Sequence, residues 1–282
     1  MQDLKQNTPR ILTTTDFSAK SEKAYYHALA FTVACQGRLT ILHTGSESRG
    51  SVPWERFPGV RETMQRWGRL GPDAPREAVF EQLNIGISKM AMRDDDPRQG
   101  ITDYIRKRPT DLLVMTTAGR TGLARVFNPS VAESVAQQTR ARTLMLPHRG
   151  RGFIDPDSGK SSLQHVLCAL DASTDPRPAL AYLSQWLPIF SRGQLEVRVL
   201  LFNQPDDTPE VVLPRIEGQE WSKHLSSDDS AEGIAAAARG MSADLVMVTS
   251  RERLGLGARM RGSLIDNLLR TLKVPLLSIP PA

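Results

Sequence analysis

The pattern of apolar and polar positions predicts a strand, a helix and a second strand between residues 111 and 147. The apolar run 112–115 is short enough for a strand that is buried on both faces of a sheet. Ser130 has the position of a helix N-cap, and Glu133 follows three residues later as its capping-box partner. The apolar run 143–146 then predicts the next strand. Such a strand–helix–strand crossover is the building unit of a parallel sheet.

The loop between the first of these strands and the helix contains Gly119 and Gly122. Glycine allows the backbone to turn sharply and to come close to a bulky group. A glycine loop ahead of a helix also collects free backbone N–H groups at the positive end of the helix dipole. The loop therefore predicts either a phosphate-binding crossover or a tight turn that binds nothing.

The same pattern occurs a second time, later in the chain and without a gap. Asp244 begins an apolar run that matches the run beginning at Asp111. At the same offset, the agreement extends to the glycine loop, the helix N-cap and the last strand. The matched positions are Gly255, Ser263 and residues 276–280, opposite Gly122, Ser130 and residues 143–147. A repeat of this length is a duplicated domain rather than a turn of a solenoid.

Short apolar runs and amphipathic helices alternate through the rest of each copy, and right-handed crossovers assemble such a series into an open parallel sheet with helices on both faces. We therefore predict an α/β fold of two tandem, doubly wound, Rossmann-like domains with five parallel strands each. The predicted domains are residues 1–149 and 163–282, joined by a solvated linker at 150–162. In the first copy we expect strands at 10–15, 39–43 and 87–92, and helices at 22–36, 61–70 and 100–108. In the second copy we expect strands at 166–170 and 195–201, helices at 178–190 and 231–240, and an irregular section at 204–223.

Composition and charge narrow the class of protein. A chain of 282 residues with 40% hydrophobic and 24% charged residues is typical of soluble globular proteins. No apolar run reaches the ~20 residues that span a bilayer, and the polar N-terminus lacks the apolar core of a signal peptide. The net charge of +5 is modest and the arginines are scattered, so we expect no nucleic-acid binding. Cys35 and Cys168 lie in separate copies on apolar elements, which favours reduced core residues in a cytoplasmic protein.

Candidate chemistry gathers at the carboxyl ends of the strands, where sheets of this class bind ligands at the point of strand-order reversal. In the first copy Asp16, flanked by Thr15 and Phe17, follows the first strand, and Thr44 ends the second. A carboxylate there could accept hydrogen bonds from an adenine or from a ribose hydroxyl. The glycine loop and the Ser130 hydroxyl could hold phosphates. The alternative role for Asp16 is a helix cap.

The duplication and these motifs resemble a tandem universal stress protein, with two copies of that domain in one polypeptide, over nearly the whole chain. The resemblance implies the adenine nucleotide alpha hydrolase-like fold. In nucleotide-binding members, Gly-x-x-Gly and a spacer precede Gly-Ser or Gly-Thr, and the aspartate after the first strand lies against the adenosine. Carried onto this sequence, the resemblance implies a nucleotide site at Thr15, Asp16, Phe17, Thr44, Gly119, Gly122, Ser130 and Val131, and a second site at Asp171, Gly255, Gly262 and Ser263. It also implies that the last strands of the copies, 143–146 and 276–279, pair as an internal pseudo-dimer.

Each copy departs from that family pattern at one position. In the first, Pro129 replaces the glycine before Ser130, which removes one N–H donor and fixes the local φ. In the second, Glu252 stands where the first loop glycine is expected, and a carboxylate there would repel a phosphate unless a cation offsets it. The first copy therefore fits a nucleotide better.

We expect a non-enzymatic cytoplasmic regulator of stress survival that binds ATP or AMP, with Mg²⁺ only together with the nucleotide. Its protein partner is not readable from the sequence, and a further homodimer is left open. One alternative is an interaction scaffold without nucleotide, and another is a slow ATP hydrolase. Hydrolysis would need a base and a metal site, and the sequence offers no convincing base near either loop and no metal-ligand spacing. No catalytic residue is therefore predicted.

Overall fold

The computed structural model describes residues 8–46, 52–117, 131–139, 141–191, 193–203, 211–249 and 263–280. The first half contains β1 (Arg10–Thr14), α1 (Ala19–Cys35), β2 (Arg38–Gly45), the 3-10 helix η3 (Trp54–Arg56), α2 (Val60–Arg66), α3 (Ala78–Glu81), β3 (Gly86–Arg93), α4 (Pro97–Lys107), β4 (Leu112–Thr116), α6 (Val131–Thr139) and β5 (Thr143–Leu146). The second half contains β6 (His165–Asp171), α7 (Arg177–Phe190), β7 (Leu195–Phe202), β8 (Gln219–Leu225), α8 (Ala231–Gly240), β9 (Leu245–Thr249), α10 (Leu264–Thr271) and β10 (Leu276–Ile279).

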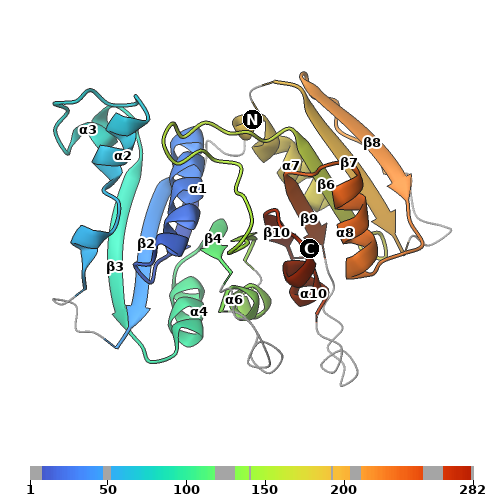
Figure 1. The fold of residues 1–282 in the computed structure, drawn as a ribbon, viewed down its shortest axis with the longest axis horizontal. Helices are drawn as coiled ribbons and strands as arrows, with labels where there is room; N and C mark the ends of the chain where they lie inside the picture. The colour runs from blue at the N-terminus through green and yellow to red at the C-terminus, as the bar shows by residue number, and fades with distance from the viewer. Residues whose placement is uncertain are drawn as a thin grey trace.

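The ten strands of the described residues form one continuous sheet in the order β3-β2-β1-β4-β5-β10-β9-β6-β7-β8 (Figure 1). Every neighbouring pair is parallel except β5 and β10, which pair antiparallel at the centre, with Leu144 opposite Leu277 and Thr143 opposite Ser278. The predicted pseudo-dimer is confirmed, because each half supplies five strands and their last strands pair. Strand order reverses between β1 and β4 in one half and between β6 and β9 in the other.

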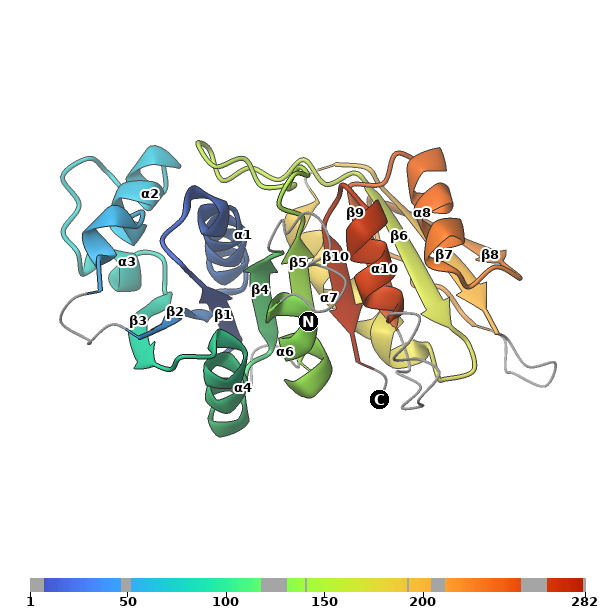
Figure 2. The same cartoon turned by 60° about the horizontal axis from the view of Figure 1, so that its bottom comes forward.

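Helices cover both faces of this sheet (Figure 2). Side chains of α1, α2 and α7 join the core on one face, and those of α4, α6, α8 and α10 join the core on the other. Successive strand residues point to opposite faces, so Ile11 belongs to the first core and Leu12 to the second. Burial on both faces explains why the inner strands are continuous apolar runs in the sequence.

Asp111 and Asp244, which correspond to each other in the two repeats, each bind the start of a strand to the strand beside it. Asp111 precedes β4 and Asp244 precedes β9. In the first half, Asp111 Oδ2 accepts a hydrogen bond from the Arg10 N–H at 2.8 Å. In the second half, Asp244 Oδ2 accepts hydrogen bonds from the N–H groups of Gln164 and His165 at 3.0 and 3.1 Å. Its Oδ1 accepts one from the guanidinium of Arg151 in the linker at 2.8 Å. The aspartate that begins each repeat therefore has a structural role at the amino ends of the strands, away from the predicted ligand edge.

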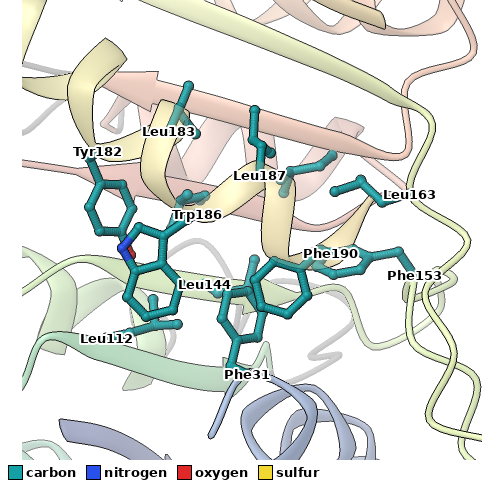
Figure 3. Close-up of a pocket in the computed structure, with 12 residues that line it drawn as sticks. Phe31, Leu112, Leu144, Phe153, Leu163, Tyr182, Leu183, Trp186, Leu187 and Phe190 are labelled. Carbon is teal, nitrogen blue, oxygen red and sulfur yellow. The ribbon is translucent and has the colours of Figure 1, made fainter. Parts of the chain in front are cut away.

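The two halves also pack through α1 and α7. The ring centroid of Phe31 lies 3.8 Å from that of Phe190 and 5.6 Å from that of Trp186. A cavity of about 20 Å³ remains beside these rings, between the halves, and its lining is apolar (Figure 3). That volume is close to one water molecule, so the cavity is a small packing defect rather than a ligand site.

Most predicted helices and strands are present with their ends shifted by a few residues, but the predicted irregular section 204–223 is wrong in part. Its end forms the first part of β8, which lies at the edge of the sheet. All residues of β8 are half-buried or exposed. A strand in this setting needs no apolar alternation, so its sequence carries no strand pattern.

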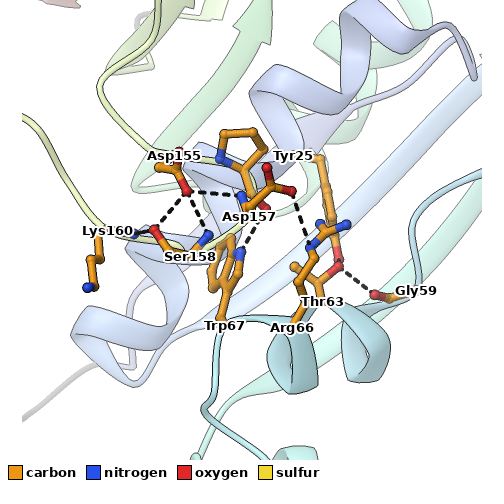
Figure 4. Close-up of polar contacts among 10 residues, drawn as sticks. Tyr25, Gly59, Thr63, Arg66, Trp67, Asp155, Asp157, Ser158 and Lys160 are labelled. Atoms are coloured by element: carbon orange, nitrogen blue, oxygen red, sulfur yellow. Dashed lines mark hydrogen bonds and ion pairs between the residues drawn. The ribbon is translucent and has the colours of Figure 1, made fainter.

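The linker was expected to be solvated, and this expectation is wrong for its central part. Phe153 and Ile154 are only 2% and 7% exposed. Ile154 also begins a hairpin that closes through an antiparallel bridge to Ser161. The hairpin rests on the first half, where the Trp67 indole N–H donates to the Pro156 carbonyl at 2.9 Å (Figure 4). The linker therefore belongs to the packed structure.

Candidate functional site

The candidate site of the first half lies at the carboxyl ends of β1 and β4, where the strand order reverses. Thr15, Asp16 and Phe17 directly follow β1, and Thr44 is the penultimate residue of β2. The two strand ends are joined there, because Nδ1 of His43 lies 2.9 Å from the Thr15 carbonyl oxygen. The structure therefore brings these predicted residues to one edge of the sheet.

The exposed Asp16 carboxylate is oriented by its own loop. Its Oδ1 accepts hydrogen bonds from the Ser18 N–H at 3.0 Å and from the Ser18 hydroxyl at 2.5 Å. Partial desolvation acts to raise the pKa of Asp16, but these hydrogen bonds outweigh it and hold the pKa below its usual value. Ser18, and not Asp16, is the N-cap residue of α1. Asp16 thus carries an ionised carboxylate that can accept further hydrogen bonds.

Phe17 directs its ring into an aromatic group formed with His43, Trp54 and Phe57. The centroid of the Phe17 ring lies 4.7 Å from that of His43, 5.2 Å from that of Trp54 and 6.1 Å from that of Phe57. The backbone of Phe17 is left-handed, with a φ of 60°, which costs a bulky residue about 1–3 kcal/mol. The ring contacts hold this conformation, so Phe17 braces the loop that carries Asp16.

The remaining predicted residues of the first site fall into two groups. Thr44 is approached closely by α4, since a Cβ at Gly100 would lie 3.0 Å from the Thr44 Cγ2. Val131 begins α6, is half-buried and packs against the second core. The loop positions Gly119, Gly122 and Ser130 lie outside the described residues, as do Gly255 and Gly262 of the second half.

In the second half, Asp171 is the last residue of β6 and is hydrogen-bonded to the end of β9 and to its own loop. Its N–H donates to the Thr249 hydroxyl at 3.3 Å, and its Oδ1 accepts from the Ser173 N–H at 3.0 Å. Ser263 is the N-cap of α10, where its hydroxyl accepts from the Asp266 N–H at 3.0 Å. Both residues therefore have structural partners close to them in the chain, and their contact with a nucleotide stays a prediction.

The two halves differ at the position next to the aspartate. In the second half Phe202 lies opposite Asp171 in the β6–β7 ladder. The β1–β2 ladder ends with Thr14 opposite Leu42, and Asp16 and Thr44 each follow two residues later in their own segment. Phe202 is 3% exposed and packs in the second core, so a buried phenyl ring replaces a half-buried hydroxyl. Sequence reasoning missed this difference, although an alignment of the second strands of the two copies would have found it.

Both cysteines are free thiols, with Cys168 buried and Cys35 half-buried. Burial raises the pKa of Cys35 to about 12 and raises that of Cys168 as well. Among the described residues, no three His, Cys, Asp or Glu side chains are placed to hold one metal ion. No helix in that part of the chain combines the length and the apolar character needed to cross a membrane.

A duplicated, doubly wound α/β domain with an aspartate at the reversal point of each half of the sheet defines a class of two-domain α/β proteins. A family model described as the universal stress protein family matches residues 7–147 and 210–280. The chain therefore belongs to the universal stress protein family, in its tandem form.

Two known structures share the fold over nearly the whole chain. A universal stress protein from Archaeoglobus fulgidus DSM 4304 matches with a TM-score of 0.64 and 17% identity over 97% of this chain and 96% of its own. A protein of unknown function from Pseudomonas aeruginosa PAO1 matches with a TM-score of 0.60 and 13% identity over 98% of this chain and 94% of its own. A universal stress protein in complex with cAMP covers 49% of this chain and 96% of its own, with 19% identity and a TM-score of 0.34. No curated protein sequence matches the chain.

Proposed function

We propose that this universal stress protein is a cytoplasmic, non-enzymatic regulator that binds an adenine nucleotide, ATP or AMP, in its first half. The contrast between the two ligand edges carries this proposal. The first edge presents an ionised, exposed carboxylate at Asp16, and the half-buried Thr44 lies two residues past the end of the β1–β2 ladder. At the second edge, the buried ring of Phe202 lies beside Asp171.

The described groups of the first edge fit a nucleoside. The Asp16 carboxylate can accept hydrogen bonds from ribose hydroxyls or from an exocyclic amine, and the Thr44 hydroxyl can donate or accept one. The phosphates would then lie toward the glycine loop, where Gly119, Gly122 and Ser130 are the proposed contacts. Mg²⁺ would enter only with a nucleotide, bound through the phosphate oxygens.

Calorimetric titration with ATP, AMP and cAMP, with and without Mg²⁺, tests the proposal. The wild type should bind about one equivalent of nucleotide, and Asp16→Ala should weaken binding by roughly tenfold or more, the loss of one or more hydrogen bonds to a charged group. Asp171→Ala is the matched control in the second half and should leave the affinity unchanged. A Gly122→Asp variant, which places a carboxylate in the proposed phosphate loop, should abolish binding.

Two results would contradict this assignment. Equal loss in Asp16→Ala and Asp171→Ala would mean that both halves bind. No heat at millimolar nucleotide would favour an interaction scaffold, the function that Pro129, Glu252 and the buried Phe202 support. In that case the search would turn to protein partners and to a homodimer of the whole chain.

A further inference from the structure

Residues 147–154, which run from the end of β5 into the linker, lie along α1 and are referred to here as the strap. Two side chains of α1 hold it. Lys23 Nζ donates to the carbonyl oxygens of Pro147 at 3.1 Å and Gly150 at 2.5 Å. One turn further along the helix, His27 Nε2 lies 3.0 Å from the Phe153 nitrogen and 3.2 Å from the Ile154 nitrogen. The strap is therefore bound by a cation at its start and by an imidazole at its end.

The hydrogen-bond partners of His27 determine its protonation state. Nδ1 lies 2.8 Å from the Lys23 carbonyl oxygen, which can only accept, so Nδ1 carries the hydrogen. Nε2 faces two backbone N–H groups, which can only donate, so Nε2 must present its lone pair. The ring is therefore neutral when the strap is bound. A proton on Nε2 would face both N–H groups and would replace two hydrogen bonds by repulsion.

We propose that His27 makes the strap an acid-sensitive latch, so that release of residues 150–154 from α1 becomes more favourable at mildly acidic pH while the β5–β10 pairing stays intact. Release would withdraw Phe153 from the contact between the halves, where its ring centroid lies 6.4 Å from those of both Phe31 and Phe190. Gly152 makes the bound state compact, because a Cβ there would lie 2.3 Å from the His27 Cε1.

The groups around His27 favour the neutral ring in the bound state. His27 is fully buried, and its pKa is lowered to about 4, chiefly by desolvation. The Lys23 charge lowers the pKa further, whereas the hydrogen bond to the Lys23 carbonyl raises it. The two carboxylates of the strap and of the hairpin that follows it have other partners. Asp155 accepts from Ser158, and Asp157 lies 4.0 Å from the Arg66 guanidinium. Arg151, a cation of the strap, pairs with Asp244.

Two other elements complete these surroundings. His148, at the start of the strap, lies near Lys20 and Lys23, and its pKa is lowered by desolvation and by these cations. The α7 rings packed against Phe153 and Phe31, those of Phe190 and Trp186, are uncharged. His27 and His148 are thus two imidazoles at the strap, and the surroundings of each lower its pKa.

The size of the effect follows from linkage. Once released, His27 should regain the ordinary histidine pKa of 6.5, against a pKa of about 4 in the bound state. Between pH 7 and pH 5 the equilibrium constant for release should then rise by roughly 20-fold. The same change in pH should leave the central strands unaffected, because their hydrogen bonds are made between backbone groups.

Hydrogen–deuterium exchange of the whole chain at pH 7 and pH 5, corrected for intrinsic exchange rates, tests the latch. Peptides covering residues 150–156 should lose protection by roughly 20-fold at pH 5, while peptides of β5 and β10 keep theirs. His27→Gln, whose side chain stays neutral, should abolish the pH dependence. His148→Gln, the matched control within the strap, should retain it.

Three outcomes would overturn the proposal. The first is equal protection of residues 150–156 at both pH values in the wild type. The second is parallel loss of protection in the strap and in β5 and β10, which would report global unfolding. The third is loss of the pH dependence in His148→Gln together with its persistence in His27→Gln. The wild-type comparison decides the first two even where a variant folds poorly.

Discussion

Replacing Phe31 by alanine should weaken the packing between the two halves. Phe31 is 8% exposed, so almost its whole ring is removed from water. Burial of such a side chain contributes about 1.5–3 kcal/mol. The ring also fills space beside Phe190 and Trp186, at 3.8 and 5.6 Å between centroids. Its removal would enlarge the neighbouring cavity of about 20 Å³, which adds a further cost for unfilled volume. We expect Phe31→Ala to lower the free energy of unfolding by about 4 kcal/mol.

Urea denaturation followed by circular dichroism measures this change. Phe80→Ala is the matched control, because Phe80 is 64% exposed and its loss should change the free energy of unfolding by no more than about 0.5 kcal/mol. The urea dependence of the free energy should stay similar in all three proteins if they unfold in one step. Equal stability of Phe31→Ala and Phe80→Ala would refute the view that the α1–α7 contact stabilises the pseudo-dimer.

Three further predictions concern the aspartates, the strap and pH. Asp244→Ala removes the acceptor of three hydrogen bonds and should lower the free energy of unfolding, measured by urea denaturation, by about 3 kcal/mol. Asp111→Ala removes the acceptor of one hydrogen bond and should lower it by about 1 kcal/mol. Similar losses in the two variants would contradict this. Gly152→Ala should lower the free energy of unfolding by about 2 kcal/mol, because the added Cβ overlaps the His27 ring. Gly71 has open space around it, so Gly71→Ala should be neutral or slightly stabilising in the same assay. Because folding lowers the His27 pKa to about 4, its contribution to stability is complete above pH 6.5 and is lost as the pH falls toward 4. Relative to His27→Gln, the wild type should therefore lose about 2 kcal/mol of stability between pH 7 and pH 5, measured by urea denaturation at each pH; parallel pH profiles would refute this.

The sequence was sufficient for the fold because the inner strands and the duplication leave strong patterns. A strand such as β4 is buried on both faces, so it is an uninterrupted apolar run in the sequence. The edge strand β8 is half-buried or exposed throughout and leaves no such pattern. The burial of Phe153 in the linker was equally invisible, because it depends on α1 and α7, which are distant in sequence.

The candidate site could be predicted only in part for a similar reason. Asp16 was predicted because it follows a recognisable strand that ends at the reversal point of the sheet. The position of the Phe17 ring was not predictable, since its partners Trp54 and Phe57 come from the irregular segment after β2. Such contacts between a loop and an insertion have no periodic signal in the sequence.

The antiparallel pairing of β5 and β10 within one chain has a consequence for how the two halves can change. Two separate subunits would associate in proportion to their concentration, and a symmetric pair would have to carry the same residue at both ligand edges. Within one polypeptide, association is intramolecular and does not weaken on dilution. A substitution can then enter one half alone, as Phe202 opposite Asp171 illustrates, while the other half keeps its polar edge and the shared sheet stays whole.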